Sequence, residues 1–541
     1  MQADLIIING NVITMDEKKP RAEAVVVKDG LITYVGKTKD ALSWKSKETE
    51  IRDVSGKTVM PGFIESHMHP THYGLNLLEI DCRPESAPTI HAILQKIKEL
   101  AARIPKGEWI RGWGWDDSKL KEGRIPTRWE LDQAAPNHPV VLKRTCNHMV
   151  VVNSLALAIS DIKKETNQPV GGHIECDDET AEPTGLLQEK AQGMVAAPEY
   201  DLEEMEKGMK LAQQDFVKWG ITTVHDMATQ NLELALYQQM LSKKQLKVRV
   251  RPWIWAIDQN GWKGLLEEVV ALGIRSGFGN NMLRIQGVKY MLDGSVGGRT
   301  AAVAQPYEKD EKLGILYNDV DEIAPLFKQS LEAGLRVAVH GIGERAIEVA
   351  LKAFEIAAKH LPIQRMRNRI EHCALPTENQ LERMKQLELI AASSIGFLYH
   401  IGDSYLTNLG KERMNRVYPH RSFRDYGIIA PGNSDLPVTG GNPFTGIYAA
   451  ITRKSITGQV LDEIQNISLD EALRAYTTDA AYSSWEEDLI GALQPSAHAD
   501  MIILSHDPYE ISPEQLLNIE VEQTFIGGQA VFSKESETVK G

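Results

Sequence analysis

Two histidines separated by one residue, His67 and His69, follow an apolar segment that begins at Val59. This segment, Val59-Met60-Pro61-Gly62-Phe63-Ile64, is typical of a short buried strand. Alternate side chains of an extended backbone point to the same side, so both imidazoles can reach one point in space. Neutral imidazoles bind zinc and similar divalent ions, and two of them provide half of a tetrahedral site. An isolated pair of this kind is more often a pair of strand-end histidines without a metal, so the hypothesis depends on further ligands downstream.

Four more residues that can bind a metal follow later strand-like segments: Lys289, His340, His372 and Asp435. Each lies at or near the end of an apolar stretch. In a (β/α)₈ barrel the carboxyl ends of the strands meet at one rim, where such barrels carry their active sites. The residues follow one another in the order in which a barrel would bring them together. The sequence therefore favours a metal site over chance alignment.

The elements that must position these residues alternate between strands and helices. The predicted strands are Val59–Ile64, Ile221–His225, Val248–Trp255, Ile285–Leu292, Leu335–His340, Asn368–His372, Ala391–Ile395 and Ile428–Ser434. Helix-like stretches rich in Glu, Lys, Ala and Leu lie between most of them, at 202–219, 320–333, 344–360 and 378–386. Eight strands with helical crossovers predict an α/β fold, namely a (β/α)₈ TIM barrel.

The two ends of the chain differ from this middle part. Short strand-like runs with Asn9-Gly10 and Asp29-Gly30 turns predict antiparallel hairpins near the N-terminus, and the C-terminal stretch is similar. We therefore expect residues 1–58 and 489–541 to form one small β-sandwich domain, with the barrel at 59–488. An insertion at about 75–200 is too long for a simple crossover. Its aromatic segment, Trp109–Asp117, suggests a cap over the barrel mouth.

Composition excludes several classes of protein. The chain has 541 residues, a formal net charge of −14 and a pI near 5.6, which argues against a nucleic-acid partner. Its four cysteines are widely spaced and show no C-x-x-C pattern, so a disulfide framework is not expected. No signal peptide is visible, and no apolar stretch reaches the ~20 residues needed to cross a bilayer. We expect a cytoplasmic protein with no membrane partner, and the sequence leaves a homo-oligomer open.

With these motifs the sequence resembles the amidohydrolase superfamily, and within it the amidohydrolase-3 branch of metal-dependent hydrolases that includes N-substituted formamide deformylase. The resemblance covers nearly the whole chain, and it rests on the segments 61–70, 288–295 and 433–438 together with His340 and His372. Two further segments of the insertion, 147–157 and 182–187, resemble the branch specifically. Glu65 occupies a position at which Asp is more usual before the two histidines.

The resemblance implies a divalent metal cofactor, expected to be zinc, with two ions per chain. In this arrangement His67, His69 and Asp435 bind one ion, and His340 and His372 bind the other. Lys289 is carboxylated and bridges both, since a neutral amine that has captured carbon dioxide becomes an anionic carbamate, and burial lowers the pKa of lysine. The alternative is a strand-end Lys289 that pairs with Asp293, which would leave a mononuclear site.

The activity implied is hydrolysis of a non-peptide carbon–nitrogen bond, of amide or formamide type, in a small-molecule substrate by a metal-activated hydroxide. Asp435 would act as the catalytic base and then as the acid. Trp115, His148 and Arg299 are weaker predictions as substrate contacts. Two alternatives stay open: a deaminase of a cyclic amidine within the same superfamily, and a non-catalytic metal-binding regulator.

Overall fold

The structure of the protein is a computed structural model that describes residues 2–117, 119–145, 149–169, 171–259, 261–308 and 310–535. The chain forms two compact units, one of Met1–Pro70 with Gln213–Gly541 and one of Thr71–Ala212. The predicted insertion at about 75–200 lies within the second unit. Across the described ranges, no helix is long and apolar enough to cross a membrane.

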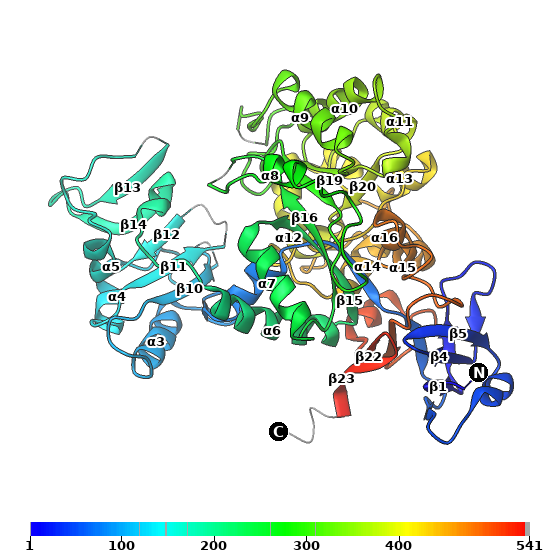
Figure 1. Ribbon diagram of the computed structural model, residues 1–541. Helices are drawn as coiled ribbons and strands as arrows, with labels where there is room; N and C mark the ends of the chain where they lie inside the picture. Colours follow the sequence, from blue (N-terminus) through cyan, green and yellow to red (C-terminus); the bar gives the residue numbers. More distant parts are fainter. Residues whose placement is uncertain are drawn as a thin grey trace. The chain divides into compact units, whose positions relative to one another are not determined.

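A seven-stranded parallel sheet forms the centre of the first unit, with the strand order β20-β19-β18-β17-β16-β15-β8 (Figure 1). Its strands are β8 (Phe63–Met68), β15 (Ile221–Thr229), β16 (Arg249–Trp255), β17 (Gly287–Met291), β18 (Val337–Gly341), β19 (Arg369–His372) and β20 (Ile390–Ser393). Six of them overlap the second to seventh predicted strands, with ends shifted by a few residues. The first predicted strand, Val59–Ile64, is divided: Phe63 and Ile64 belong to β8, whereas residues 59–61 belong to β7 (Thr58–Pro61), a strand of another sheet. The α/β barrel prediction is therefore confirmed at the level of a nearly closed parallel barrel.

The predicted eighth strand, Ile428–Ser434, is the exception, since it joins the sheet through only one bridge, between Ser393 and Gly432. Backbone hydrogen bonds nevertheless place the segment between the two outer strands. On one side the amides of Ala391 and Ser393 donate to its carbonyl groups, at 3.1 and 2.9 Å. On the other side the amide of Asp435 donates to the carbonyl of His67 at 3.0 Å. This segment therefore closes most of the gap between β20 and β8.

Helices surround the sheet because alternate strand residues point outward and are apolar. Val288 and Tyr290 of β17 pack in the same buried cluster as residues of the outer helices, while Lys289 lies between them in sequence. In β18 the outward Val339 precedes His340 in the same way. The pattern of period two thus directs apolar side chains to the helices and polar ones into the barrel.

Some of the helices that follow the barrel strands begin with N-terminal capping boxes. In α11, for example, the side chain of Thr377 accepts from the third residue of the helix, and Gln380 returns the bond. The main helices of this unit are α7 (Asn231–Ser242), α8 (Leu266–Ala271), α9 (Val320–Glu332), α10 (Glu344–Ala358), α11 (Glu378–Gln386), α12 (Gly396–Leu409), α13 (His420–Tyr426), α14 (Pro443–Thr452), α15 (Leu469–Ala475) and α16 (Thr478–Ser483). The helix α6 (Leu202–Lys218) spans the junction of the two units.

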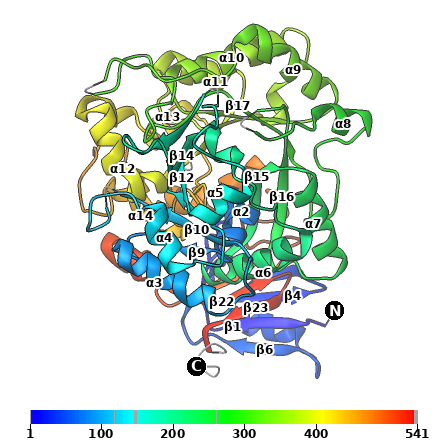
Figure 2. The ribbon, with the colours of Figure 1, turned by 90° about the vertical axis from the view of Figure 1, so that its left-hand side faces the viewer.

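Two further sheets of the first unit are formed by strands near the ends of the sequence, one from the N-terminal part alone and one from both parts. A four-stranded sheet has the order β5-β4-β1-β6, and a six-stranded sheet has the order β23-β22-β21-β7-β2-β3. The strands are β1 (Leu5–Ile8), β2 (Asn11–Ile13), β3 (Arg21–Ala22), β4 (Ala24–Lys28), β5 (Leu31–Gly36), β6 (Glu50–Asp53), β7 (Thr58–Pro61), β21 (Met501–Leu504), β22 (Val521–Ile526) and β23 (Gln529–Ser533). Figure 2 draws the last strands, in red, close to the first ones, in blue.

Apolar residues of the two sheets share one buried cluster, to which Ile7 contributes from the first sheet and Met501 from the second. The two sheets belong to the same compact unit as the barrel. A separate β-sandwich domain therefore stays a prediction.

The terminal sheet leads directly into the barrel. Only Gly62 separates β7 from β8, and its amide donates to the carbonyl of Asp500 at 3.1 Å. A Cβ atom at position 62 would lie 2.2 Å from Cγ2 of the buried Thr222, which no real side chain tolerates. Glycine is thus required where the strand that carries the two histidines enters the barrel.

The second unit has its own mixed sheet, in the order β13-β14-β12-β11-β10-β9. Its elements are α2 (Pro70–Asn76), β9 (Ile80–Asp81), α3 (Ile90–Ala101), β10 (Ile110–Trp115), α4 (Arg128–Ala134), β11 (Val140–Arg144), β12 (Met149–Val152), α5 (Ser154–Ile159), β13 (Gly172–Cys176) and β14 (Pro183–Glu189). A buried cluster that includes Ile93, Trp115 and Leu142 lies between α3, α4 and the sheet. This unit therefore has a hydrophobic core of its own.

Candidate metal centre

Three of the predicted ligands meet inside the barrel. His67, His372 and Asp435 are buried, and each offers a ligand atom within 4.8 Å of those of the other two. Nε2 of His67 lies 3.4 Å from Oδ1 of Asp435, and Nε2 of His69 lies 3.1 Å from the same oxygen. The barrel thus brings β8 and the closing segment together as the sequence predicts.

His340 extends this group along the rim. Its ring centroid lies 4.5 Å from that of His372, which in turn lies 4.6 Å from that of His67. Consecutive imidazoles from three different strands are therefore in contact. Such a row of histidines provides several nitrogen donors to one or two adjacent ions.

Two of these residues have a left-handed backbone. His372 has φ 66° and Asp435 has φ 53°, values that are uncommon for residues other than glycine. In a regular strand His372 would point away from the barrel interior, because Glu371 beside it points inward. The left-handed turn at the end of β19 instead directs the His372 ring toward His67 and His340. Local strain of this kind is concentrated at functional sites.

Glu371 determines which ring nitrogen of His67 carries the proton. Oε2 of Glu371 lies 2.6 Å from Nδ1 of His67, and both side chains are buried. The carboxylate is ionised because Arg369 donates to both of its oxygens, so Nδ1 must donate to it. Burial also holds the pKa of His67 well below its ordinary value, which keeps the ring neutral. Nε2 therefore keeps a free lone pair directed at Asp435.

A hydroxyl group orients His372 in a similar way. Oγ of Ser394 lies 2.7 Å from Nδ1 of His372 and donates its own proton to Oδ1 of Asn433, also at 2.7 Å. Since the single hydroxyl proton is used for Asn433, Nδ1 of His372 is the donor. Burial lowers the pKa of His372 as well, so its Nε2 is a neutral acceptor.

His340 offers the opposite nitrogen. Its Nε2 lies 3.0 Å from the carbonyl oxygen of Gly294, which can only accept, and 3.2 Å from Oδ1 of Asp293. Nε2 therefore carries the proton, and Nδ1 remains as the acceptor. Asp293 is fixed by the amides of Ile342 and Gly343, at 3.0 and 2.9 Å, so the loop after β17 holds this histidine in place.

Lys289 lies on β17, where its backbone pairs with Ala338 of the neighbouring strand. The residue is 3% exposed. Burial lowers the pKa of its amine, although the negative charges of Glu371 and Asp435 act in the opposite direction. No ion pair of Lys289 with Asp293, which was the alternative from the sequence, occurs among the described residues.

The surroundings of the Asp435 carboxylate indicate whether these side chains can hold a cation. Its Oδ1 atom is buried, and the Nε2 atoms of His67 and His69 lie 3.4 and 3.1 Å from it. Burial alone would raise the pKa of Asp435, but His67 and His69 hold it below the ordinary value. A buried carboxylate oxygen close to several imidazole nitrogens is the type of donor set that a divalent metal requires. The residues therefore fit a metal.

Several residues that orient the centre were not predicted. Glu371 and Ser394 lie beside strand ends that the sequence analysis identified, but nothing in their residue types reveals their hydrogen bonds. Glu65 was noted only as a departure from Asp. In the structure its two oxygens accept from the amide and the hydroxyl of Ser434, at 2.9 and 3.1 Å, which fixes the residue before Asp435.

Three residues, Trp115, His148 and Arg299, are predicted from the sequence to contact the substrate. Trp115 is fully buried in the core of the second unit, and its Nε1 donates to the carbonyl of Leu142 at 3.0 Å. Arg299 is exposed in the loop after β17 and donates to Oδ1 of Asn408 at 3.0 Å. His148 lies outside the described residues. All three stay predictions.

Known proteins resemble this chain along almost its whole length. YtcJ of Bacillus subtilis (strain 168), a candidate amidohydrolase by name, is 30% identical over 538 residues, which cover 97% of this chain and 98% of YtcJ. The N-substituted formamide deformylase of Arthrobacter pascens is 27% identical, and the match covers 97% of each chain.

Solved structures show the same fold. An uncharacterized metal-dependent hydrolase from Pyrococcus horikoshii has a TM-score of 0.78 and 28% identity, covering 94% of this chain and 99% of that one. The zinc complex of the atrazine chlorohydrolase TrzN from Arthrobacter aurescens, at 15% identity and a TM-score of 0.55, covers 98% and 96% and shares the fold. The sequence profile of the amidohydrolase family matches residues 50–532. The chain therefore belongs to the amidohydrolase family.

Proposed function

We propose that this protein hydrolyses a non-peptide carbon–nitrogen bond, of amide or formamide type, in a small molecule. The observation that carries the proposal is the buried oxygen of Asp435 among the imidazoles of His67 and His69. The full-length similarity to a formamide deformylase supports this class of substrate.

A divalent ion held by these side chains supplies Lewis acidity, which makes water nucleophilic near neutral pH and polarises a substrate carbonyl. We assign His67, His69 and Asp435 to one ion and His340 and His372 to a second. The orientation of the rings by Glu371, Ser394 and Gly294 supports this assignment, because an imidazole binds a cation only through a ring nitrogen that carries no proton.

Asp435 is the residue that we assign to proton transfer. Its carboxylate is ionised and lies at the end of the closing segment, where the carboxyl ends of the other strands also meet. It would accept a proton from the attacking water and deliver it to the leaving nitrogen. Ser434, fixed by Glu65, holds this carboxylate in register with β8.

Whether the proposed centre holds one ion or two depends on Lys289. We propose that its buried amine reacts with carbon dioxide and bridges the ions as a carbamate. The lowered pKa supports this step, since only the neutral amine is nucleophilic. A deaminase with a single ion would have no use for this lysine, so its burial inside the barrel favours the hydrolase.

The test is metal analysis of protein purified without added metal, followed by a screen of formamides, N-acyl amines and cyclic amides. We expect close to two zinc-like ions per chain and hydrolysis that is lost on chelation and regained when zinc is added. Ammonia release from cyclic amidines, without hydrolysis of any amide, would instead identify a deaminase. Folded protein that binds no metal and loses nothing on chelation would contradict the proposed function.

A further inference from the structure

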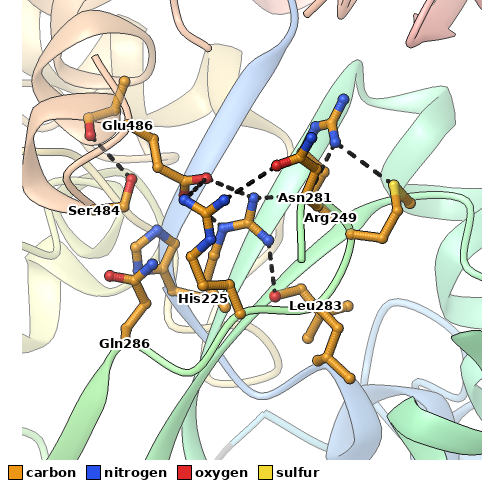
Figure 3. Close-up of polar contacts among 12 residues, drawn as sticks. His225, Arg249, Asn281, Leu283, Gln286, Ser484 and Glu486 are labelled. Atoms are coloured by element: carbon orange, nitrogen blue, oxygen red, sulfur yellow. Dashed lines mark hydrogen bonds and ion pairs between the residues drawn. The ribbon is translucent and has the colours of Figure 1, made fainter. Parts of the chain in front are cut away.

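Several charged side chains are buried inside the barrel. This buried charge layer consists of Arg249, Arg251, Arg336, Arg369, Glu371 and Glu486, and the buried His225 lies beside it. Figure 3 shows part of it, with Glu486 and Asn281 beside guanidinium groups and His225 close to them. Buried charges cost free energy unless each is paired and hydrogen-bonded. The contacts of each guanidinium therefore indicate what it holds in place.

Arg369 holds Glu371 through two hydrogen bonds. Its Nε lies 2.7 Å from Oε1 of Glu371 and its Nη2 lies 2.8 Å from Oε2, and both residues are fully buried. A guanidinium that binds both oxygens fixes the plane of a carboxylate. Because Oε2 is also the acceptor for Nδ1 of His67, Arg369 determines the direction in which the His67 ring is held.

The same guanidinium also contacts the backbone of the histidine strand. Nη2 of Arg369 donates to the carbonyl of Ser66, the residue before His67, at 2.7 Å. Its Nη1 lies 3.2 Å from Nδ1 of His225 on β15, and that nitrogen also accepts from Trp253 of β16 at 3.2 Å. The side chain of Arg369 in β19 is therefore hydrogen-bonded to both β8 and β15, next to His67.

We infer that Arg369 is a positioning residue for the metal centre, which it serves by fixing both the ring and the backbone of His67. This inference rests on the metal site of the proposed function. Lysine cannot replace the guanidinium here, because an ammonium group donates from one point and cannot bind both carboxylate oxygens together with the Ser66 carbonyl. The positive charge alone would survive the replacement, whereas the orientation would not.

The experiment compares Arg369→Lys with a matched control, Arg251→Lys. Arg251 is fully buried on β16 and binds both oxygens of Glu486, at 2.5 and 2.8 Å, but no described contact joins it to His67. Zinc affinity is measured by competition with a chelator, the ligand geometry by the visible spectrum of the cobalt-substituted protein, and stability by denaturant unfolding. We expect Arg369→Lys to lose zinc affinity by about 10- to 100-fold and to change the cobalt spectrum.

The control variant, Arg251→Lys, should be less stable than the wild type. Its zinc affinity and its cobalt spectrum should be unchanged. Equal zinc affinity and an unchanged spectrum in Arg369→Lys would overturn the inference while leaving the proposed function intact. Wild-type protein that binds neither zinc nor cobalt would overturn both. If Arg369→Lys does not fold, Glu371→Gln is compared with Glu486→Gln by the same measurements, and the loss of zinc affinity must again be confined to the first variant.

Discussion

Three histidines of the centre, His67, His340 and His372, each have one ring nitrogen held by a neighbouring group. A carboxylate uses Nδ1 of His67, a hydroxyl uses Nδ1 of His372, and a carbonyl uses Nε2 of His340. Three different acceptors thus select the tautomer at three positions before any ion is bound. Such preorganisation lowers the cost of assembling a metal site, because the rings do not have to reorient.

Asp435→Asn separates metal binding from proton transfer. We expect the variant to fold and to retain at least one ion, because the four histidines remain. Turnover should fall by about 10²- to 10⁴-fold, since an amide has no basic site for the proton of water. The measurements are kcat on the identified substrate and metal content per chain. Near wild-type turnover would show that another residue is the base.

Lys289→Ala tests the carbamate bridge. The variant lacks the amine that carbon dioxide would modify, so we expect activity to be abolished and metal content to fall. A short-chain carboxylic acid added to the variant should restore part of the activity, because its carboxylate can occupy the place of the carbamate. Unchanged turnover and metal content would contradict the binuclear arrangement.

The residues that we propose as ligands could be identified from the sequence, whereas those that orient them could not. His67, His340 and His372 were predictable because a ligand is recognised by its residue type at a strand end. Ser394 carries no such signal, since a serine at the end of a strand has many ordinary uses. Its role arises only from the left-handed turn at His372, which depends on how β19 ends in three dimensions.

At the scale of elements, the seven regular strands were predictable from their apolar runs. The eighth differs for a physical reason: it contains Pro431, which has no N–H group to donate to a ladder, and Gly432 beside it. The segment therefore occupies its place in the barrel without full strand pairing. The second unit was predictable as an insertion, but its six-stranded sheet order was not, because three of its pairings are antiparallel and three-dimensional register has no sequence signal here.

Two helices of the second unit approach each other through glycines. A Cβ atom at Gly208 of α6 would lie 2.6 Å from the carbonyl oxygen of Gly74 in α2. We expect Gly208→Ala to destabilise the protein by about 1–3 kcal/mol, because the backbone of the partner helix cannot move aside easily. The matched control is Gly193→Ala, where a Cβ meets nothing within 4 Å. Denaturant unfolding of both variants checks this, and equal stability would show that α2 and α6 can separate.

A substitution at Trp115 tests whether the aromatic segment of the second unit packs in the hydrophobic core or contacts the substrate. Its full burial and the satisfied indole N–H favour packing. We expect Trp115→Ala to cost about 3–5 kcal/mol of stability with relative rates across substrates unchanged. Unfolding curves and rates on two amides of different size provide the comparison. A changed substrate preference at nearly full stability would instead support the predicted substrate contact.

For the whole molecule, metal binding at the proposed centre would be coupled to folding, because the centre is assembled from strands that are far apart in the sequence. Any ion that binds only the folded chain adds to its stability, by about 2.7 kcal/mol at a hundred times the dissociation constant. We expect chelation to lower the melting temperature and added zinc to restore it. Melting curves at increasing zinc concentration measure the effect, and the variant His67→Ala should respond much less. A melting temperature that is independent of zinc would contradict the site.

The six-stranded sheet that contains both chain ends has a consequence for biosynthesis. Its strand β7, which continues into the first histidine strand, pairs with β21, and β21 begins only at Met501. During translation the edge of β7 therefore stays unpaired until residues 501–504 have left the ribosome. An unpaired strand edge invites association with other nascent chains. Chains truncated before residue 501 should therefore aggregate during synthesis, and ribosomes stalled before residue 501 should carry incompletely folded protein.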